Sequence, residues 1–250
     1  MKATQIYDYI FLGTSVWYLQ AVREGEPING EGFLRYNLNS LIDDLNIYGL
    51  KVSRRAASDL EAFVDTLSRE ERELIDEDQA RKIRSLSTVL RSTIDAESRG
   101  IIAYAISEKR YDSGRMISDP WSLFKDEAKD YLSDIAIYDI EEAAKCIVFE
   151  RPTASAFHLM RAAESTLKDM YCSAVKRERV ALMWGPMTSH LRKRNTKIDV
   201  ALVDHLDNIR RNFRNPTQHP EKIYDLTEVQ DLFGVCIDVI NRMIPYLSKR

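Results

Sequence analysis

Residues 210–221 read Arg-Arg-Asn-Phe-Arg-Asn-Pro-Thr-Gln-His-Pro-Glu and interrupt a region whose apolar residues recur at helical spacing. Pro216 disfavours helical dihedral angles at Asn215, so a helix expected over 198–213 should end here. One more helix is expected after this segment, over about 227–248, with Thr227 and Gln230 at capping-box spacing. The segment therefore predicts a joint between the last two helices of a bundle.

The region that leads to this joint also has helical spacing. Residues 135–250 are expected to hold five helices joined by short connections, which is typical of a helical bundle. The expected ranges are 137–149, 152–175, 184–195, 198–213 and 227–248. Asp119-Pro120 predicts a further helix start, with Pro at the first helical position. We expect the domain boundary near 110–135 and place the bundle domain at 135–250.

Residues 1–134 are expected to form a mostly helical N-terminal region of unknown role. Helices are expected over 5–22 and 33–48, joined by a turn at residues 25–30. A long helical hairpin over 53–98 follows.

Capping-box spacing places the break in that hairpin near 68–77, because it occurs in Ser68 with Glu71 and in Asp76 with Gln79. The apolar run 101–106 is open between a short strand and a helical turn. The predicted fold class is all-α.

The composition is that of a chain that buries a core, with 44% apolar residues and only nine Gly and seven Pro. No apolar run reaches the roughly 18 residues of a membrane span, so no membrane contact is expected. The segment from Met1 to Gln20 lacks a basic region followed by a clean apolar stretch, so no signal peptide is expected. Three widely spaced cysteines, Cys146, Cys172 and Cys236, predict buried free thiols in a reducing compartment, hence a cytoplasmic protein.

Charge is unevenly distributed along the chain. The net charge is −3, yet residues 1–134 carry −6 and residues 135–250 carry +3. Within residues 177–214, only four acidic residues (Glu178, Asp199, Asp204 and Asp207) oppose nine basic ones: Arg177, Arg179, Arg192, Lys193, Arg194, Lys197, Arg210, Arg211 and Arg214. A local basic surface on an acidic protein suits a polyanion that docks at one place. A solvated helix face would show the same pattern.

The segment 210–221 resembles the signature of the HEPN (higher eukaryotes and prokaryotes nucleotide-binding) superfamily: an Arg, a polar residue, a few variable positions and a His. Arg214, Asn215 and His219 fill it here. Upstream, Phe157-His-Leu-Met-Arg-Ala-Ala-Glu164 looks like a helix of bacterial members of the group. The resemblance covers about residues 135–250. It implies an HEPN-like helical domain, pairing of two chains through the motif face, and a metal-independent endoribonuclease.

The chemistry of the two outer motif residues fits that activity. Cleavage of RNA by its own 2′-hydroxyl needs one proton removed, one proton delivered and negative charge stabilised at phosphorus. Histidine titrates near neutrality and serves either proton transfer. Arginine is a permanent donor shaped for phosphate oxygens. Arg214 and His219 are therefore the predicted catalytic residues, and a homodimer would supply two histidines. The structural alternative is a capping arginine and a loop histidine.

Five other residues are weaker candidates for the site. Asn215 would orient His219 or bind phosphate, or would cap the preceding helix. Glu164 and Arg161 are expected to support the motif, although a structural salt bridge is the alternative for Glu164. Arg210 and Arg211 are candidate RNA-binding residues or simply surface residues. The remaining histidines, His158, His190 and His205, are expected to be structural or surface residues rather than catalytic ones.

Other chemistries lack their motifs. The sequence has no glycine-rich phosphate loop, no G-x-G-x-x-G, no H-E-x-x-H, no paired C-x-x-C and no G-x-S-x-G. We therefore expect no cofactor and no metal. The expected function is an endoribonuclease of bacterial defence or toxin–antitoxin systems acting on RNA. A protein partner or antitoxin would bind the N-terminal region. The alternative is an inactive HEPN-fold module that binds RNA, a nucleotide or a partner protein.

Overall fold

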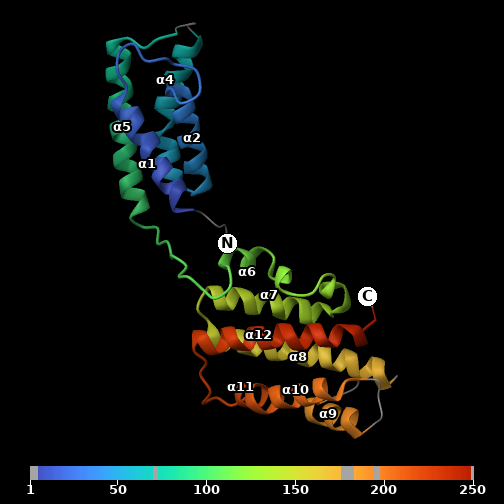
Figure 1. Ribbon diagram of the computed structural model, residues 1–250. Helices are drawn as coiled ribbons and strands as arrows, with labels where there is room; N and C mark the ends of the chain where they lie inside the picture. The colour runs from blue at the N-terminus through green and yellow to red at the C-terminus, as the bar shows by residue number, and fades with distance from the viewer. Residues whose placement is uncertain (1–4, 70–72, 176–182, 194–197, 249–250) are drawn as a thin grey trace. The chain divides into compact units, whose positions relative to one another are not determined.

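A computed structural model describes residues 5–69, 73–175, 183–193 and 198–248 (Figure 1). The predicted all-α class is confirmed, since regular β-structure in these residues is limited to a single bridge between Pro27 and Leu74. Contacts divide the chain into an N-terminal unit, Met1–Tyr104, and a C-terminal unit, Ala105–Arg250. Each described helix is too short or too polar to cross a membrane.

The N-terminal unit packs its helices around one aliphatic core. They are α1 (Ile6–Ala21), α2 (Leu34–Ile47), α3 (Lys51–Ala56), α4 (Ser58–Arg69) and α5 (Glu77–Ser98). Helix α1 packs against α2 and α5, and α3 packs against α5. Leu19, Leu41, Leu60 and Ile83 are fully buried between them.

The expected helices of this unit are present. The predicted Asp76–Gln79 capping box is formed, with Gln79 N–H donating to the Asp76 carboxylate at 2.9 Å. Ser68 lies in the last turn of α4 rather than at a helix start, and Glu71 falls outside the described residues. Residues 101–106 have no regular secondary structure.

The C-terminal unit is a bundle centred on one long helix, α8. Its helices are α6 (Ser113–Ser118), α7 (Asp134–Val148), α8 (Pro152–Val175), α9 (Trp184–Lys193), α10 (Val200–Ile209), α11 (Asn215–Thr217) and α12 (Leu226–Met243). Three 3-10 turns complete it: η1 (Pro120–Leu123), η2 (Ala128–Tyr131) and η4 (Ile244–Tyr246). Helices α7 and α12 pack along α8, while α9 and α11 contact it from another side (Figure 1).

Two predicted boundaries differ from the structure. The two units divide after Tyr104, earlier than the expected boundary near 110–135, because residues 105–134 belong to the C-terminal core. Met116 and Leu132 are buried there, and Tyr111 meets Phe233 edge to face at 5.3 Å. The expected Thr227–Gln230 cap of the last helix is wrong. Asp225 caps α12 instead and forms the capping box with Glu228.

Candidate functional site

The motif segment is helical as far as Thr217, so the predicted joint before the last helix begins later than expected. A π-helical turn, η3 (Arg210–Arg214), follows α10 directly and runs into α11. Asn215 has φ −65° and ψ −51°, and its N–H donates to the carbonyl of Arg210, five residues earlier. The prediction that the helix ends at Asn215 was therefore wrong. A proline ring collides with the carbonyl four residues earlier in a regular α-helix. The π turn takes up one extra residue and so accommodates Pro216. Such turns are frequent at functional sites.

Arg214 is held against helix α8. Its Nη2 donates to Glu164 Oε2 at 3.3 Å, and Lys168 Nζ lies 3.1 Å from the other oxygen of Glu164. Both members of the Arg214–Glu164 pair are mostly buried, with side chains 29% and 18% exposed. Arg214 Nε is buried without a hydrogen-bond partner among the described residues. A buried donor without a partner is costly, and an incoming acceptor would satisfy it.

His219 and Asn215 are not tied to this pair. His219 is exposed, and its backbone N–H donates to Pro216 O at 2.9 Å. Within the described ranges, neither the His219 ring nor the Asn215 amide has a side-chain hydrogen bond, and no hydrogen bond joins Arg214 to His219. Asn215 is the C-cap of η3 through its backbone N–H, and its own backbone is helical. The segment thus presents one anchored cation and one free imidazole.

Arg161 pairs with a buried carboxylate of helix α7 and, in the described part of the chain, has no ion pair with the motif residues. It lies on α8, and its Nε is 3.2 Å from Asp139 Oδ2 on α7. Asp139 is fully buried and accepts a hydrogen bond at 2.8 Å from His158 Nδ1, also on α8. The ring of Tyr138 meets the His158 ring edge to face at 6.2 Å. The structure thus joins His158, Arg161 and Asp139 around one buried charge.

Arg210 and Arg211 surround Asp207. Arg210 Nε donates to Asp207 Oδ1 at 3.0 Å, Arg211 Nη2 bonds the other oxygen, and Arg192 Nη2 is 3.8 Å away. Burial raises the pKa of Asp207, but the hydrogen bonds and positive charges of Arg210 and Arg211 outweigh it and leave the pKa below its usual range. The arginines are therefore partly neutralised, although Arg211 remains 65% exposed.

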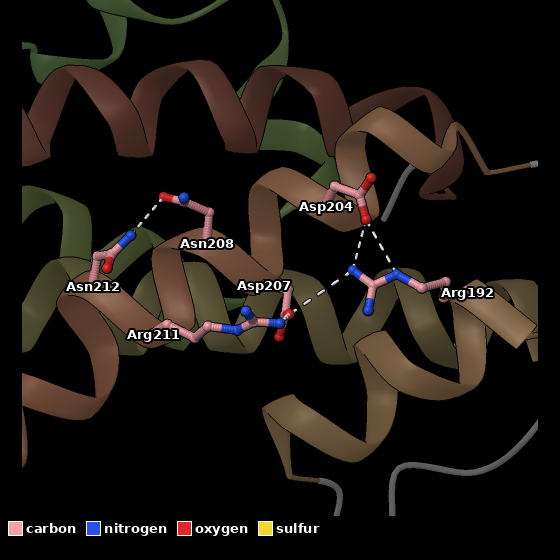
Figure 2. Close-up of a pocket in the computed structure, with 6 residues that line it drawn as sticks. All are labelled: Arg192, Asp204, Asp207, Asn208, Arg211 and Asn212. Carbon is pink, nitrogen blue, oxygen red and sulfur yellow. Dashed lines mark hydrogen bonds and ion pairs between the residues drawn. The ribbon is translucent and has the colours of Figure 1, made fainter.

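A pocket of about 340 Å³ opens beside these arginines (Figure 2). In it, Arg192 donates to Asp204 at 2.6 and 3.1 Å, and Asn212 Nδ2 donates to Asn208 Oδ1 at 3.0 Å. The charged lining groups already pair with one another. Of the other predicted basic residues, Arg177, Arg179, Arg194 and Lys197 lie outside the described residues.

Asp139 was not predicted as a site residue, although the sequence contains one sign that it is buried and paired. Asp139 interrupts the buried stripe of α7 formed by Ala136, Ile140, Ala143 and Ile147. A carboxylate inside an apolar stripe is buried at a high cost unless partners are supplied from another helix. The partners on the next helix, His158 and Arg161, were not linked to Asp139 by any sequence pattern.

The remaining histidines and the cysteines are weaker candidates for catalysis. His190 Nδ1 lies 2.6 Å from the Tyr171 hydroxyl, and His205 Nδ1 lies 3.6 Å from Asp238. The three thiols, all in described segments, form no disulfide; Cys236 is buried as expected, whereas Cys146 and Cys172 are only half-buried. Burial raises the pKa of Cys236 to about 12, which makes its thiol inert. Across the part of the chain that is described, no three His, Cys, Asp or Glu side chains cluster as metal ligands would.

Comparison of the chain with protein-family models, with curated proteins and with solved structures found no match.

Proposed function

We propose that the C-terminal unit is a metal-independent endoribonuclease of the HEPN type, acting in a bacterial defence or toxin–antitoxin setting. The observation that carries the proposal is the Arg214–Glu164 pair. A guanidinium is fixed by a carboxylate on a neighbouring helix, retains an unsatisfied donor, and lies five residues before an exposed histidine in the turn that follows α11. Anchored arginines of this kind bind phosphate oxygens with little loss of side-chain freedom.

The reaction would leave a 2′,3′-cyclic phosphate and a 5′-hydroxyl. One imidazole takes the proton of the 2′-hydroxyl, the 2′-oxygen attacks phosphorus, and the bond from phosphorus to the 5′-oxygen breaks. A second imidazole protonates that leaving oxygen, while Arg214 stabilises the added negative charge. Pairing of two chains through the motif face would bring two copies of His219 to one RNA. Lys168 and Arg214 together outnumber Glu164, so the surroundings favour an anion.

The test is incubation of the purified protein with total RNA in EDTA. We expect cleavage with 2′,3′-cyclic phosphate ends, abolished by Arg214→Ala and by His219→Ala. His190→Ala is the matched control, because that histidine lies on α9, outside the motif segment, and bonds Tyr171. Robust cleavage by both motif variants would eliminate the proposed site.

Arg210 and Arg211 would contribute electrostatic attraction rather than chemistry. Arg211→Gln should weaken RNA binding and lower the slope of log K against log salt by about one. An unchanged slope would show that Asp207 neutralises this arginine completely.

A second candidate function is protein binding by the N-terminal unit. Helix α1 exposes large apolar side chains that the unit itself does not cover: Ile6 (75% exposed), Tyr7 (66%), Ile10 (59%) and Trp17 (67%). Exposed groups of this size mark interaction surfaces. An antitoxin or a second copy of the chain would fit there.

Light scattering of the full chain separates these two occupants. With pairing through the motif face, the double variant Ile10→Ser/Trp17→Ser stays a dimer. A monomeric double variant would show that the α1 surface, not the motif face, joins the chains.

A further inference from the structure

Helix α8 is the central helix of the C-terminal bundle, and one narrow stripe of it reaches the surface. Its members follow one another at spacings of three, four, three and four, which keeps them on one side of an α-helix. Each of them is exposed or half-buried, whereas the intervening Leu159, Met160, Ala162 and Ala163 are buried. We call these residues the α8 stripe: Ala154, Phe157, Arg161, Glu164 and Lys168.

The α8 stripe includes the partner of the motif arginine. Arg214 donates to Glu164 at 3.3 Å, and Lys168 lies 3.1 Å from the same carboxylate. The stripe is therefore part of the motif face, through which the proposed function pairs two chains. Its charges alternate in sign along the helix, with a cation at Arg161, an anion at Glu164 and a second cation at Lys168. Such an order of charges is able to complement itself.

Two-fold symmetry leaves few ways for the stripe to meet a second copy of itself. In a two-fold pair, a residue i that contacts the partner's j requires that j also contacts the partner's i. Parallel helices would set every charge against its own copy. Antiparallel helices that cross at Arg161 would bring two guanidinium groups together, and helices that cross at Glu164 would bring two carboxylates together. Like charges in contact are unfavourable. Crossing midway, between Ala162 and Ala163, avoids both repulsions.

The midway crossing gives each of the four larger side chains an attractive partner. Arg161 meets the partner's Glu164, and Phe157 meets the partner's Lys168, each contact occurring twice. Arg161 is 59% exposed and meets Asp139 through Nε, which leaves its two Nη groups for a carboxylate of another chain. Phe157 is 42% exposed, and an ammonium group over an aromatic ring is attracted to it.

We propose that the α8 stripe is the seam through which two copies of this chain pair, antiparallel, about a two-fold axis between Ala162 and Ala163. The inference rests on the pairing through the motif face that the proposed function includes. Packed helices lie about 8–10 Å apart, so the backbones of the two Glu164 residues are about 10 Å from one another. Both Arg214–Glu164 pairs then lie at the same seam, one from each chain. RNA is the less suitable occupant, because the carboxylate of Glu164 stands in the middle of the stripe.

The first test follows assembly of the full chain by light scattering over a dilution series, without RNA. We expect the wild type to be a dimer. Phe157→Lys sets two lysines together at both ends of the seam, so the dissociation constant should rise about 10-fold or more. Phe33→Lys is the matched control, because Phe33 is 40% exposed but lies at the start of α2 in the N-terminal unit. A monomeric wild type, or equal dissociation constants for the wild type and Phe157→Lys, would overturn the inference.

The second test checks the register with a complementary variant. Lys168→Glu removes both cation–ring contacts and should also weaken the pair. Mixing it with Phe157→Lys sets the introduced lysine of one chain against the introduced glutamate of the other, and retains one original Phe157–Lys168 contact. The mixture should therefore form dimers at a concentration at which each variant alone is monomeric. A mixture that stays monomeric there would overturn the proposed register, provided that circular dichroism shows both variants folded.

The outcomes separate the seam from the activity and from a different occupant. A wild type that passes both assembly tests and cleaves no RNA in EDTA ends the ribonuclease proposal and leaves the seam in place. A wild type that cleaves RNA, with Phe157→Lys as dimeric as the wild type, leaves the activity in place and ends the seam. If Phe157→Lys keeps the dimer but weakens binding of a labelled single-stranded RNA, RNA occupies the stripe and the inference is overturned.

Discussion

The two units differ in how deeply they bury the charged side chains of their ion pairs. In the N-terminal unit, ion pairs lie at the surface; Arg54 and Glu61, for example, have side chains 32% and 36% exposed. In the C-terminal unit, carboxylates with less than a fifth of their side chain exposed take arginine or histidine partners: Asp139, Glu164 and Asp207. Exposed pairs contribute about 0–1 kcal/mol. Buried carboxylates cost more than an apolar side chain would. The C-terminal unit therefore bears charges that stability alone does not require, as functional sites do.

The largest expected effect compares one arginine from each unit. Arg214→Ala should reduce RNA cleavage by about 10²–10³-fold, because it removes a donor aimed at developing charge. Arg35→Ala removes the pair with Asp65 in the N-terminal unit and should leave the cleavage rate unchanged. Rates measured on one labelled RNA check both. Equal losses in the two variants would remove the distinction between the units.

The next effect concerns stability and pH. Asp207→Asn should destabilise the C-terminal unit by about 2 kcal/mol at pH 7, because two arginines lose a buried ionised partner. The pKa of Asp207 is lowered in the folded state. Its contribution is therefore present above its unfolded pKa of about 3.9 and is lost as pH falls through the lower folded value. Urea unfolding at pH 7 and pH 3 measures the difference. The exposed Asp65→Asn, by contrast, should change stability by about 0.5 kcal/mol or less.

A smaller effect of opposite sign is expected in the N-terminal unit. Asp44 Oδ2 is buried without a partner among the described residues, and burial, with Asp8 and Asp43 nearby, raises its pKa. The charged form opposes folding at neutral pH, and protonation relieves this as pH falls through the raised pKa. Asp44→Asn should therefore raise the melting temperature by about 2 °C at pH 7 and by less near pH 4. Calorimetry checks this, with exposed Glu31→Gln as control. A fall in melting temperature would contradict it.

The smallest effect is expected for Trp17, and the buried Trp184 serves as its contrast. Trp17 is 67% exposed on α1, whereas Trp184 is 2% exposed and donates from Nε1 to Leu206 O at 3.1 Å. Trp17→Ser should change stability by about 0.5 kcal/mol or less. Trp184→Ser should cost about 4 kcal/mol. Urea midpoints measure both. A large loss for Trp17→Ser would mean that another surface covers α1 in solution.

The positions of the helices could be predicted from apolar spacing, because burying one face of a helix requires apolar side chains at that spacing. The range 152–175 matches α8, and 33–48 brackets α2 by one residue at each end. Helix ends were harder. Thr227–Gln230 and Asp225–Glu228 both have capping-box spacing, and only the folded backbone selects Asp225. The helix end predicted from Pro216 was wrong for a similar reason. The local preference of Asn215 against helical dihedral angles was overridden by the wider π turn that precedes it.

The candidate site was predictable in part. The Glu164–Arg214 contact joins two segments far apart in the sequence, and the sequence suggested it only through the helix resemblance. Arg161 was placed near the motif but pairs with Asp139 on α7. No spacing rule links Asp139 to His158, since the two lie on separate helices whose relative rotation depends on the whole core. A periodic apolar pattern indicates which face of one helix is buried, but not which residues of two helices come into contact.

The π turn at Arg210–Arg214 also fixes the length of this segment. Deleting one residue from it would restore an ordinary α-helix, in which the following positions keep nearly the same side, because the π turn holds one residue more than an α-turn. The ring of Pro216 would then meet the carbonyl four residues before it. A one-residue deletion between Ile209 and Pro216 should therefore bend or end the helix at the proline, even where individual side chains in that interval tolerate replacement.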